Sequence, residues 1–534
     1  MARNLLNKQT VLQGALTLTA AWLIIRILGA VYRIPLGRLL GDEGLGIYAV
    51  PNQIYLLFFT LSSAGIPVAV ASVVSEKMAR GHFRDALRTF RVARFAMLVL
   101  GGTFSLLLFF GAGWLIEAGL VRIPEAYLGM RAIAPVIFFA AVTAAYRGLF
   151  QGLQNMRAVA YSQLADQVML VGATLLFSYL LLPRGLSIAA AGANLGAVPG
   201  AVGATLMLVF IYRQQRRDML ELAAQDFSMA REGTLSLLRR IFSVAIPVSF
   251  AAVAMSVTHL IDQWLIIDRL QLAGLSHQQS VALFGQFNQM AMAFVNISIA
   301  LAVSLGASLV PAVSESFAKQ DMDRIRYQLG QSLRLAVLFA LPAAAGLYLL
   351  APQLTQLLFA EVEAGVPLAA LSAVVVFWSV HLVTAGALQG MGKAIVPVRN
   401  LVCGIIFKIA ITYYLTPTLG IRAAAYGTVV IFLIASLLNM VAMSRLAGMR
   451  FNLWDMLSRS VPATLVMSAG VLAVYKVAQL EMGGNTLPTL LAVAAGMVIY
   501  PVALLVLGGV RAEDVRRLPG GGRVAAFLER IGRG

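Results

Sequence analysis

The chain has few charged residues and almost no cysteine for its length. Only 12% of its 534 residues are charged, whereas a soluble domain usually carries about 25%. The single cysteine, Cys403, excludes a disulfide within the chain and a cysteine-based zinc site. No Walker lysine loop, metal-ligand cluster or Ser-His-Asp arrangement occurs between the hydrophobic runs. We therefore expect a protein that is not an enzyme, has no cofactor or metal, and is not driven directly by ATP.

Hydrophobic residues are abundant and gathered in long runs. They make up 60% of the chain, and the mean hydropathy is +0.84. A helix needs about 20 apolar residues to cross a bilayer, so the runs predict an all-α polytopic membrane protein with about fourteen transmembrane helices. Residues 1–10 lack a cleavage site and lead into an uncleaved first span. The predicted spans are 11–33, 46–72, 92–116, 130–150, 160–182, 187–212, 241–267, 281–311, 333–358, 366–389, 398–416, 422–444, 458–478 and 487–509.

The basic residues indicate the orientation of these spans. The net charge is +18, and the Lys and Arg residues stand in short clusters between apolar runs. Most of them, Arg147 and Arg157 included, fall on one side of the membrane if both termini are cytoplasmic. We therefore predict a bacterial inner-membrane protein whose basic segments contact anionic lipids, and we expect no nucleic-acid partner.

Two halves of the chain resemble each other at an offset of 236–239 residues. Three short segments recur in the same order, and Val74-Ser75-Glu76 against Val313-Ser314-Glu315 is one such match. Six predicted spans separate the copies, and because this number is even, both copies enter the membrane in the same direction. The repeat is therefore parallel, and it predicts two pseudo-symmetric six-helix lobes around a substrate cavity. The predicted organisation is an N-lobe at 1–212, a cytoplasmic linker at 213–240, a C-lobe at 241–447, two added helices at 448–510 and a basic tail at 511–534.

These residues resemble a known superfamily along essentially the whole chain. The segment from Arg26 to Arg33, the run Gly41 to Tyr48 and the Gln-Gly turns after the fourth and tenth spans are similar to the multidrug/oligosaccharidyl-lipid/polysaccharide exporters. The resemblance is to the polysaccharide-flippase branch, with the stage V sporulation protein B and MurJ types. It implies a bundle of fourteen helices that flips undecaprenyl-linked sugars outward.

Buried charges and amides provide the candidate substrate-binding residues. Arg26 lies inside the first predicted span, and Arg33 lies seven residues later on the same helical face. A guanidinium group can donate two parallel hydrogen bonds to the oxygens of a phosphate. Both match first-helix arginines of the family, whereas Arg33 at the outer end also suits simple snorkelling. MurJ-type proteins have further arginines in the second and eighth helices. Here those spans offer amides, which predicts a less cationic cavity: Asn52, Gln53, Asn288 and Gln289.

Other charged residues suit coupling, gating or structural pairing. Asp262, with His259 three residues earlier, corresponds to Arg26 in the repeat and suits ion coupling or a pair with Arg26. Glu76 and Glu315 end corresponding spans and suit a cytoplasmic gate or ordinary helix-end salt bridges. For the intramembrane charges Asp166 and Lys408 we expect pairing within a lobe, and for His381 a hydrogen-bonded packing role.

The sequence predicts a flippase that moves lipid II or a related lipid-linked oligosaccharide from the inner to the outer leaflet by alternating access. A proton, sodium or the membrane potential remains open as the energy source, and cell-wall synthesis proteins are candidate partners. Two alternatives stay open. One is a cation-coupled multidrug antiporter of the same architecture, and the other is a non-transporting scaffold for envelope or spore assembly.

Overall fold

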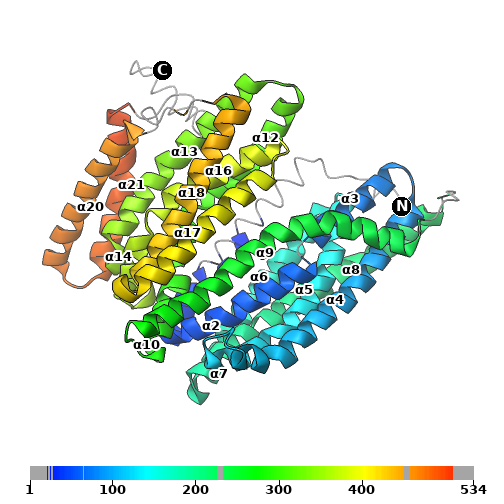
Figure 1. Ribbon diagram of the computed structural model, residues 1–534, viewed down its shortest axis with the longest axis horizontal. Coiled ribbons are helices and arrows are strands. Elements are labelled where there is room, and N and C mark those ends of the chain that lie inside the picture. The colour runs from blue at the N-terminus through cyan, green and yellow to red at the C-terminus, as the bar shows by residue number, and fades with distance from the viewer. Residues whose placement is uncertain are drawn as a thin grey trace. The chain divides into compact units, whose positions relative to one another are not determined.

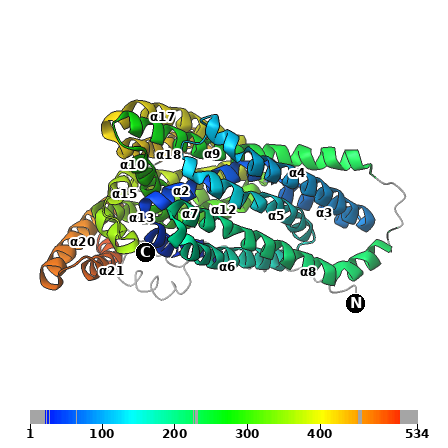
Figure 2. The ribbon, with the colours of Figure 1, turned by 90° about the horizontal axis from the view of Figure 1, so that it is seen from below.

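A computed structural model describes residues 21, 24–25, 28–29, 31–63, 65–224, 226, 232–449, 451 and 457–508. Arg26, most of the predicted first span and the tail at 511–534 lie outside these residues. Every regular element in the described ranges is a helix, as the ribbon shows (Figures 1 and 2). Contacts divide the chain into two compact units, one reaching to Asp268 with Ser276–Gly285 added, the other comprising Arg269–Leu275 and the chain from Gln286 onward.

The first unit is built from nine α-helices among its described residues. α9 belongs to it as far as Asp268, and Ser249 on this helix accepts a hydrogen bond from the backbone N–H of Gly65 at 3.0 Å. The helices are α2 (Arg33–Ser63), α3 (Ile66–Ala79), α4 (Phe83–Glu117), α5 (Tyr127–Gly152), α6 (Met156–Leu181), α7 (Leu186–Leu195), α8 (Ala197–Ala224), α9 (Thr234–Leu272) and α10 (His277–Gly285).

The continuous part of the second unit, from Gln286 onward, begins with a π-helical turn, η4 (Gln286–Ala291). The α-helices that follow in its described residues are α11 (Met292–Ser298), α12 (Ala300–Ala318), α13 (Met322–Leu349), α14 (Ala351–Phe359), α15 (Gly365–Leu371), α16 (Val374–Gly390), α17 (Ile395–Leu419), α18 (Ile421–Ala447), α20 (Ser460–Met482) and α21 (Thr486–Val506).

Local sequence signals explain several helix boundaries. Asn155 caps α6 by accepting from the backbone N–H of Ala158 at 3.3 Å, and Asp321 caps α13 by accepting from that of Arg324 at 2.9 Å. Inside α2, Gly41 adopts φ 66° and ψ −173°, a conformation that kinks the helix and that side chains disfavour. The backbone conformation at position 41 therefore explains why the run from Gly41 to Tyr48 begins with a glycine.

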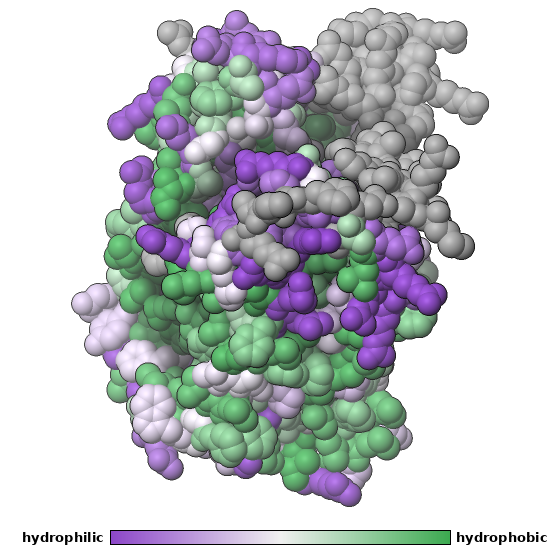
Figure 3. All heavy atoms as spheres, turned by 90° about the vertical axis from the view of Figure 1, so that its right-hand side faces the viewer, coloured by the Kyte–Doolittle hydropathy of each residue, from purple (hydrophilic) through white to green (hydrophobic). Residues whose placement is uncertain are grey.

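The surface and the helix lengths identify a multi-pass membrane protein. Large apolar side chains such as Phe110, Tyr414 and Met497 are more than 70% exposed, and hydrophobic residues cover much of the face in Figure 3. In water such exposure is rare over large areas. Among the described residues, 11 helical segments are long and apolar enough to cross a membrane, or 12 if α15 and α16, bent by 44°, form one span.

The predicted all-helical polytopic fold is confirmed, but the count of fourteen spans is not. Most of the first predicted span lies outside the described residues. The predicted span 281–311 is not one regular helix, because η4 interrupts it and a further break occurs at Ile299.

In each unit, two helices cross closely at a glycine that belongs to the sequence repeat. In the first unit, a Cβ added to Gly152 of α5 would lie 2.8 Å from Cβ of Val74 on α3. In the second, a Cβ added to Gly390 of α16 would lie 2.8 Å from Cβ of Val313 on α12. Small residues allow membrane helices to pack closely. The recurring sequence segments therefore preserve the same helix crossing.

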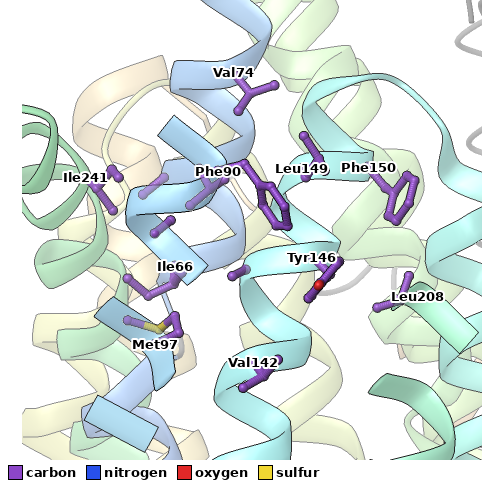
Figure 4. Packing of buried hydrophobic residues seen from close by; sticks show 14 of the residues in the cluster. Ile66, Val74, Phe90, Met97, Val142, Tyr146, Leu149, Phe150, Leu208 and Ile241 are labelled. Atoms are coloured by element: carbon purple, nitrogen blue, oxygen red, sulfur yellow. The ribbon is translucent and has the colours of Figure 1, made fainter. Parts of the chain in front are cut away.

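Each unit also has its own apolar core. In the first unit, Phe90 of α4 packs edge-on against Tyr146 of α5 with ring centroids 4.9 Å apart (Figure 4). Leu149, Phe150 and Leu208 extend this cluster across α5 and α8. In the second unit, the corresponding core joins α12, α13, α16 and α18. These cores hold the helices that carry the polar residues described next.

Candidate functional site

A polar stripe runs along one face of α2 in the first unit. Tyr48, Asn52 and Tyr55 follow helical spacing and therefore share a face. Asn52 Nδ2 donates to the carbonyl of Tyr48 at 3.0 Å and to Oδ1 of Asn194 at 2.8 Å. Asn194, on α7, is 1% exposed. The predicted binding residue Asn52 is thus held in a fixed orientation by a buried partner.

An ion pair continues this stripe across α5 and α6. Arg147 Nη2 lies 3.6 Å from Oδ2 of Asp166, and Arg147 Nε donates to Ser162 Oγ at 3.2 Å. Tyr55 is within electrostatic reach of both charges. The partner of Asp166 is thus a residue of the same unit. Sequence reasoning assigned Arg147 to a cytoplasmic segment because it stands near the end of a predicted span.

Two predicted binding residues of α2 have buried polar atoms without a hydrogen-bond partner in the described part of the chain. These are Nε of Arg33 and both amide atoms of Gln53. Gln53 is 7% exposed. Arg33 is close enough to Tyr48 for their side chains to interact electrostatically. The hydroxyl of Tyr48 lies 3.2 Å from the hydroxyl of Tyr32. Buried polar groups are usually satisfied. These unsatisfied buried polar atoms are therefore consistent with a polar ligand or water.

Asp262 and His259 lie on α9, within the part that belongs to the first unit. Asp262 is 5% exposed, and both residues make interactions. The predicted pairing of Asp262 with Arg26 remains a prediction, because Arg26 is outside the described residues. The neighbouring Gln263 is fully buried, and neither of its amide atoms has a hydrogen-bond partner among the described residues. Gln263 was not among the predicted site residues.

In the second unit, Asn288 and Gln289 lie in the π-helical turn η4. Gln289 Nε2 donates to Oδ1 of Asn288 at 3.1 Å. π-Helical turns are rare and frequent at functional sites. The matching segment of the first unit contains Pro51 inside α2, where the proline removes one backbone N–H donor from the helix.

A buried polar network joins α16, α17 and α18 in the second unit. Asn439 Oδ1 accepts from Asn400 Nδ2 at 2.9 Å, and Asn439 Nδ2 lies 3.2 Å from Nδ1 of His381. An amide nitrogen only donates, so Nδ1 of His381 accepts. Nδ2 also donates to Thr384 Oγ1 at 3.1 Å. The hydrogen-bonded packing expected for His381 is present; its partner Asn439, and Asn400 bonded to Asn439 in turn, were not predicted.

Lys408 is the deeply buried cation of α17. It is 3% exposed, and Gly427 of α18 leaves room for its side chain, since a Cβ there would lie 3.0 Å from Cγ of Lys408. Its pairing inside a lobe stays a prediction, but the close approach of α17 and α18 explains why the facing residue is small.

A charge cluster joins the ends of α3, α4 and α9 in the first unit. Glu76 pairs with Arg80 at 3.0 Å and with Arg240. Lys77 Nζ lies 3.4 Å from Asp85 and 2.9 Å from Glu232. In the second unit, the corresponding Glu315 pairs with Lys319 at 2.6 Å, within one helix turn. Glu76 therefore connects α3 to α9 within the first unit, whereas the contact of Glu315 is an ordinary helix-end salt bridge, and a gating role for either glutamate stays a prediction.

Glu232 supplies a pH-dependent contribution to this charge cluster. Partial burial raises its pKa, but hydrogen bonds from Lys77 and Ser236 and the charges of Lys77 and Arg240 hold it below the ordinary 4.5. A depressed folded-state pKa stabilises the fold above the unfolded value, and this stabilisation is lost as pH falls through the folded value. The cluster should therefore loosen on acidification below about 4.5.

We expect Glu232→Gln to lower the melting temperature at neutral pH, by the equivalent of at most about 1 kcal/mol, as for a surface pair. The difference from the wild type should shrink in thermal melts taken below pH 4.5. Glu221→Gln, which removes an exposed carboxylate of α8, is the matched control. A difference that persists unchanged at acidic pH would contradict an electrostatic role.

Buried charges and amides carried on apolar helices are typical of membrane transporters, in which they line pathways for ions or substrates. The chain belongs to the family described as "Polysaccharide biosynthesis protein", whose model matches residues 11–317. A second model, MatE, matches residues 247–414. The predicted membership of the multidrug/oligosaccharidyl-lipid/polysaccharide exporter superfamily is confirmed.

Two Bacillus subtilis proteins are similar along nearly their whole length. Stage V sporulation protein B is 26% identical, over 97% of this chain and 99% of that protein. Lipid II flippase MurJ is 26% identical, over 95% of this chain and 97% of that protein. A solved structure of the lipid II flippase MurJ, in an inward closed conformation, matches with a TM-score of 0.68 at 14% identity, over 92% of this chain and 98% of that one. At this identity the structural match establishes the fold.

Proposed function

We propose that the protein is a flippase that carries an undecaprenyl-linked sugar, lipid II or a related lipid-linked oligosaccharide, from the inner to the outer leaflet of the bacterial cytoplasmic membrane. It acts as a transporter rather than an enzyme and works by alternating access, with both termini in the cytoplasm. The observation that carries the proposal is the similarity to lipid II flippase MurJ, which extends over 95% of this chain.

The polar residues of the first unit are consistent with such a substrate. A lipid-linked sugar has a diphosphate and many hydroxyls, which guanidinium and amide groups bind. Arg33 and Gln53 have buried polar atoms with no hydrogen-bond partner among the described residues. In the second unit, Asn288 and Gln289 add amides on a π-helical turn. A proton, sodium or the membrane potential provides the driving force.

The proposal is tested by complementation. The full chain is expressed in a bacterium depleted of its own lipid II flippase, and lipid II exposed at the outer face is measured. Rescue supports lipid II as a substrate. If the protein is present in the membrane and lipid II stays inside, lipid II is not its substrate, and the same assay is repeated with a strain that lacks another lipid-linked glycan flippase.

We expect Arg26→Ala to abolish rescue at unchanged membrane abundance, because a charged fork for the diphosphate is lost. Arg26→Lys should restore rescue partly, since a point charge lacks the planar guanidinium geometry. The measurement is growth and lipid II exposure in the depleted strain, with membrane protein quantified by immunoblot. Wild-type rescue by the alanine variant would contradict a substrate contact at Arg26.

A second candidate function is cation-coupled multidrug export, which the MatE match at 247–414 favours. An antiporter should confer dye efflux on a drug-sensitive strain, and a flippase should not. Efflux without flippase rescue would replace the first proposal with the second.

A further inference from the structure

A groove lies outside the polar stripe of the first unit, between α4, α8 and the beginning of α9. Its volume is about 1100 Å³, at the upper end of the roughly 300–1,000 Å³ of small-molecule sites. α4 forms one wall, Leu220 and Ala224 of α8 a second, and Thr234, Leu238 and Phe242 of α9 a third. The ends of these helices can be followed in Figures 1 and 2.

One end of the groove is basic. Arg84, Arg88 and Arg91 line it along a single face of α4. Arg88 Nη2 donates to Thr234 Oγ1 at 3.1 Å, which orients it from the opposite wall. Asp85 also lines the groove, but it is buried and lies 3.4 Å from Lys77 Nζ, which compensates its charge. The groove therefore presents net positive charge at this end.

The other end of the groove is apolar. Beyond Arg91, the same face of α4 continues with Phe95, Val99 and Leu100, and Phe242 of α9 faces them across the groove. Phe95 and Val99 are 69% and 52% exposed. From Arg88 to Val99 the helix rises by roughly 16 Å, which is about half of a 30 Å hydrocarbon core. The groove thus combines basic and apolar parts over the depth of one leaflet.

We propose that this groove binds an anionic phospholipid, with the headgroup phosphate at Arg88 and Arg91 and an acyl chain along Phe95, Val99 and Phe242. The charge at one end requires an anion, and the length of the apolar end requires a chain that a soluble phosphate compound lacks. The positive-inside pattern predicts that the lipid comes from the cytoplasmic leaflet. The site does not depend on which substrate the protein transports.

A lipid in this groove would also contact the helices that the charge cluster joins. Its walls meet the charge cluster, because Asp85 pairs with Lys77 and Thr234 follows Glu232 by two residues in the chain. A bound headgroup at Arg88 would hold Thr234 at the first turn of α9 against α4. The lipid therefore acts as a stabilising ligand of the α4–α9 contact, and its binding should raise the melting temperature of the protein.

The test is native mass spectrometry of the full-length protein, titrated with phosphatidylglycerol or phosphatidylcholine of the same chain length. We expect phosphatidylglycerol to bind about tenfold or more tightly, because each of the two basic residues near the headgroup contributes roughly a fivefold preference. The double variant Arg88→Gln with Arg91→Gln should lose this preference. The double variant Arg216→Gln with Arg217→Gln, which removes two exposed arginines of α8 outside the groove, should keep it.

A second pair of variants tests the acyl-chain end without changing any charge. Val99→Trp fills the groove and should weaken binding of long-chain phosphatidylglycerol, whereas Leu98→Trp, on a face of α4 outside the groove, should not. Excess inorganic phosphate should not displace the long-chain lipid. Equal losses in both arginine pairs would show diffuse surface attraction, and displacement by phosphate would show a simple anion site. Either result, or equal binding of the two lipids, overturns the proposal.

Discussion

Replacing Gly386 by alanine is expected to destabilise the second unit by about 2 kcal/mol and to reduce transport. A Cβ at this position of α16 would overlap the carbonyl oxygen of Gly306 on α12 and lie 3.0 Å from its Cα. These are backbone atoms, so relief requires the two helices to separate. Overpacking of this kind costs about 1–3 kcal/mol, and van der Waals contact is the main force between membrane helices.

A matched glycine gives the control. Gly346 lies in α13 of the same unit, and a Cβ there would meet nothing within 4 Å. Gly346→Ala should leave stability unchanged or raise it by up to about 1 kcal/mol, because alanine is the better helix former. The measurement is thermal unfolding in detergent together with flippase complementation. Equal stability of the two variants would show that α12 and α16 do not depend on this contact.

The reciprocal substitution tests the mechanism further. A Cβ at Gly306 would lie 2.6 Å from the carbonyl oxygen of Leu382 on α16. Gly306→Ala alone should therefore resemble Gly386→Ala. Combining the two should cost less than their sum, since helices that have already separated accommodate a second methyl group more easily.

The glycine crossings also show what the sequence alone could predict. Hydropathy located most helices, and the repeat identified the segments around Gly152 and Gly390 as equivalent. The structure gives the reason, which is that each glycine faces a valine of the neighbouring helix, Val74 or Val313. Periodicity and repeats report such features because they extend over many residues.

Features that depend on a few residues were not predictable. Asn400 follows Arg399 at the start of a predicted span, Asn439 stands in an apolar run, and nothing in the sequence indicates that Asn439 contacts both Asn400 and His381. The π-helical turn at 286–291 has no periodic signal, so a continuous span was expected there. Arg147 stands close enough to a predicted helix end to resemble a loop cation, and its ion pair depends on the packing of α5 against α6.

Variants of the Arg147–Asp166 pair distinguish most clearly between an effect on stability and an effect on transport. We expect Arg147→Gln and Asp166→Asn each to destabilise the first unit by about 1–2 kcal/mol. A fully buried pair would lose about 3–5 kcal/mol on removal of one partner. The side chains here are 21% and 36% exposed, so solvent screening reduces the effect.

The two single variants differ in what they leave behind. Arg147→Gln leaves the carboxylate of Asp166 without its cation beside Tyr55. Asp166→Asn leaves Arg147 with its hydrogen bond to Ser162 at 3.2 Å. Arg147→Gln should therefore be the more damaging of the two. Arg157→Gln, which removes an exposed arginine in the first turn of α6, should have no comparable effect.

The double variant decides between a structural and a transport role. If the pair serves packing within the unit, Arg147→Gln with Asp166→Asn contains no uncompensated charge, so stability should recover and flippase rescue should recover with it. The thermodynamic cycle should then show a coupling energy of about 1 kcal/mol or more, as contacting residues do. Stability that returns without rescue would instead show that an ionised Asp166 or Arg147 takes part in transport. Because the charges lie beside the polar stripe of Tyr48, Asn52 and Tyr55, that outcome would extend the candidate site from α2 to α5 and α6.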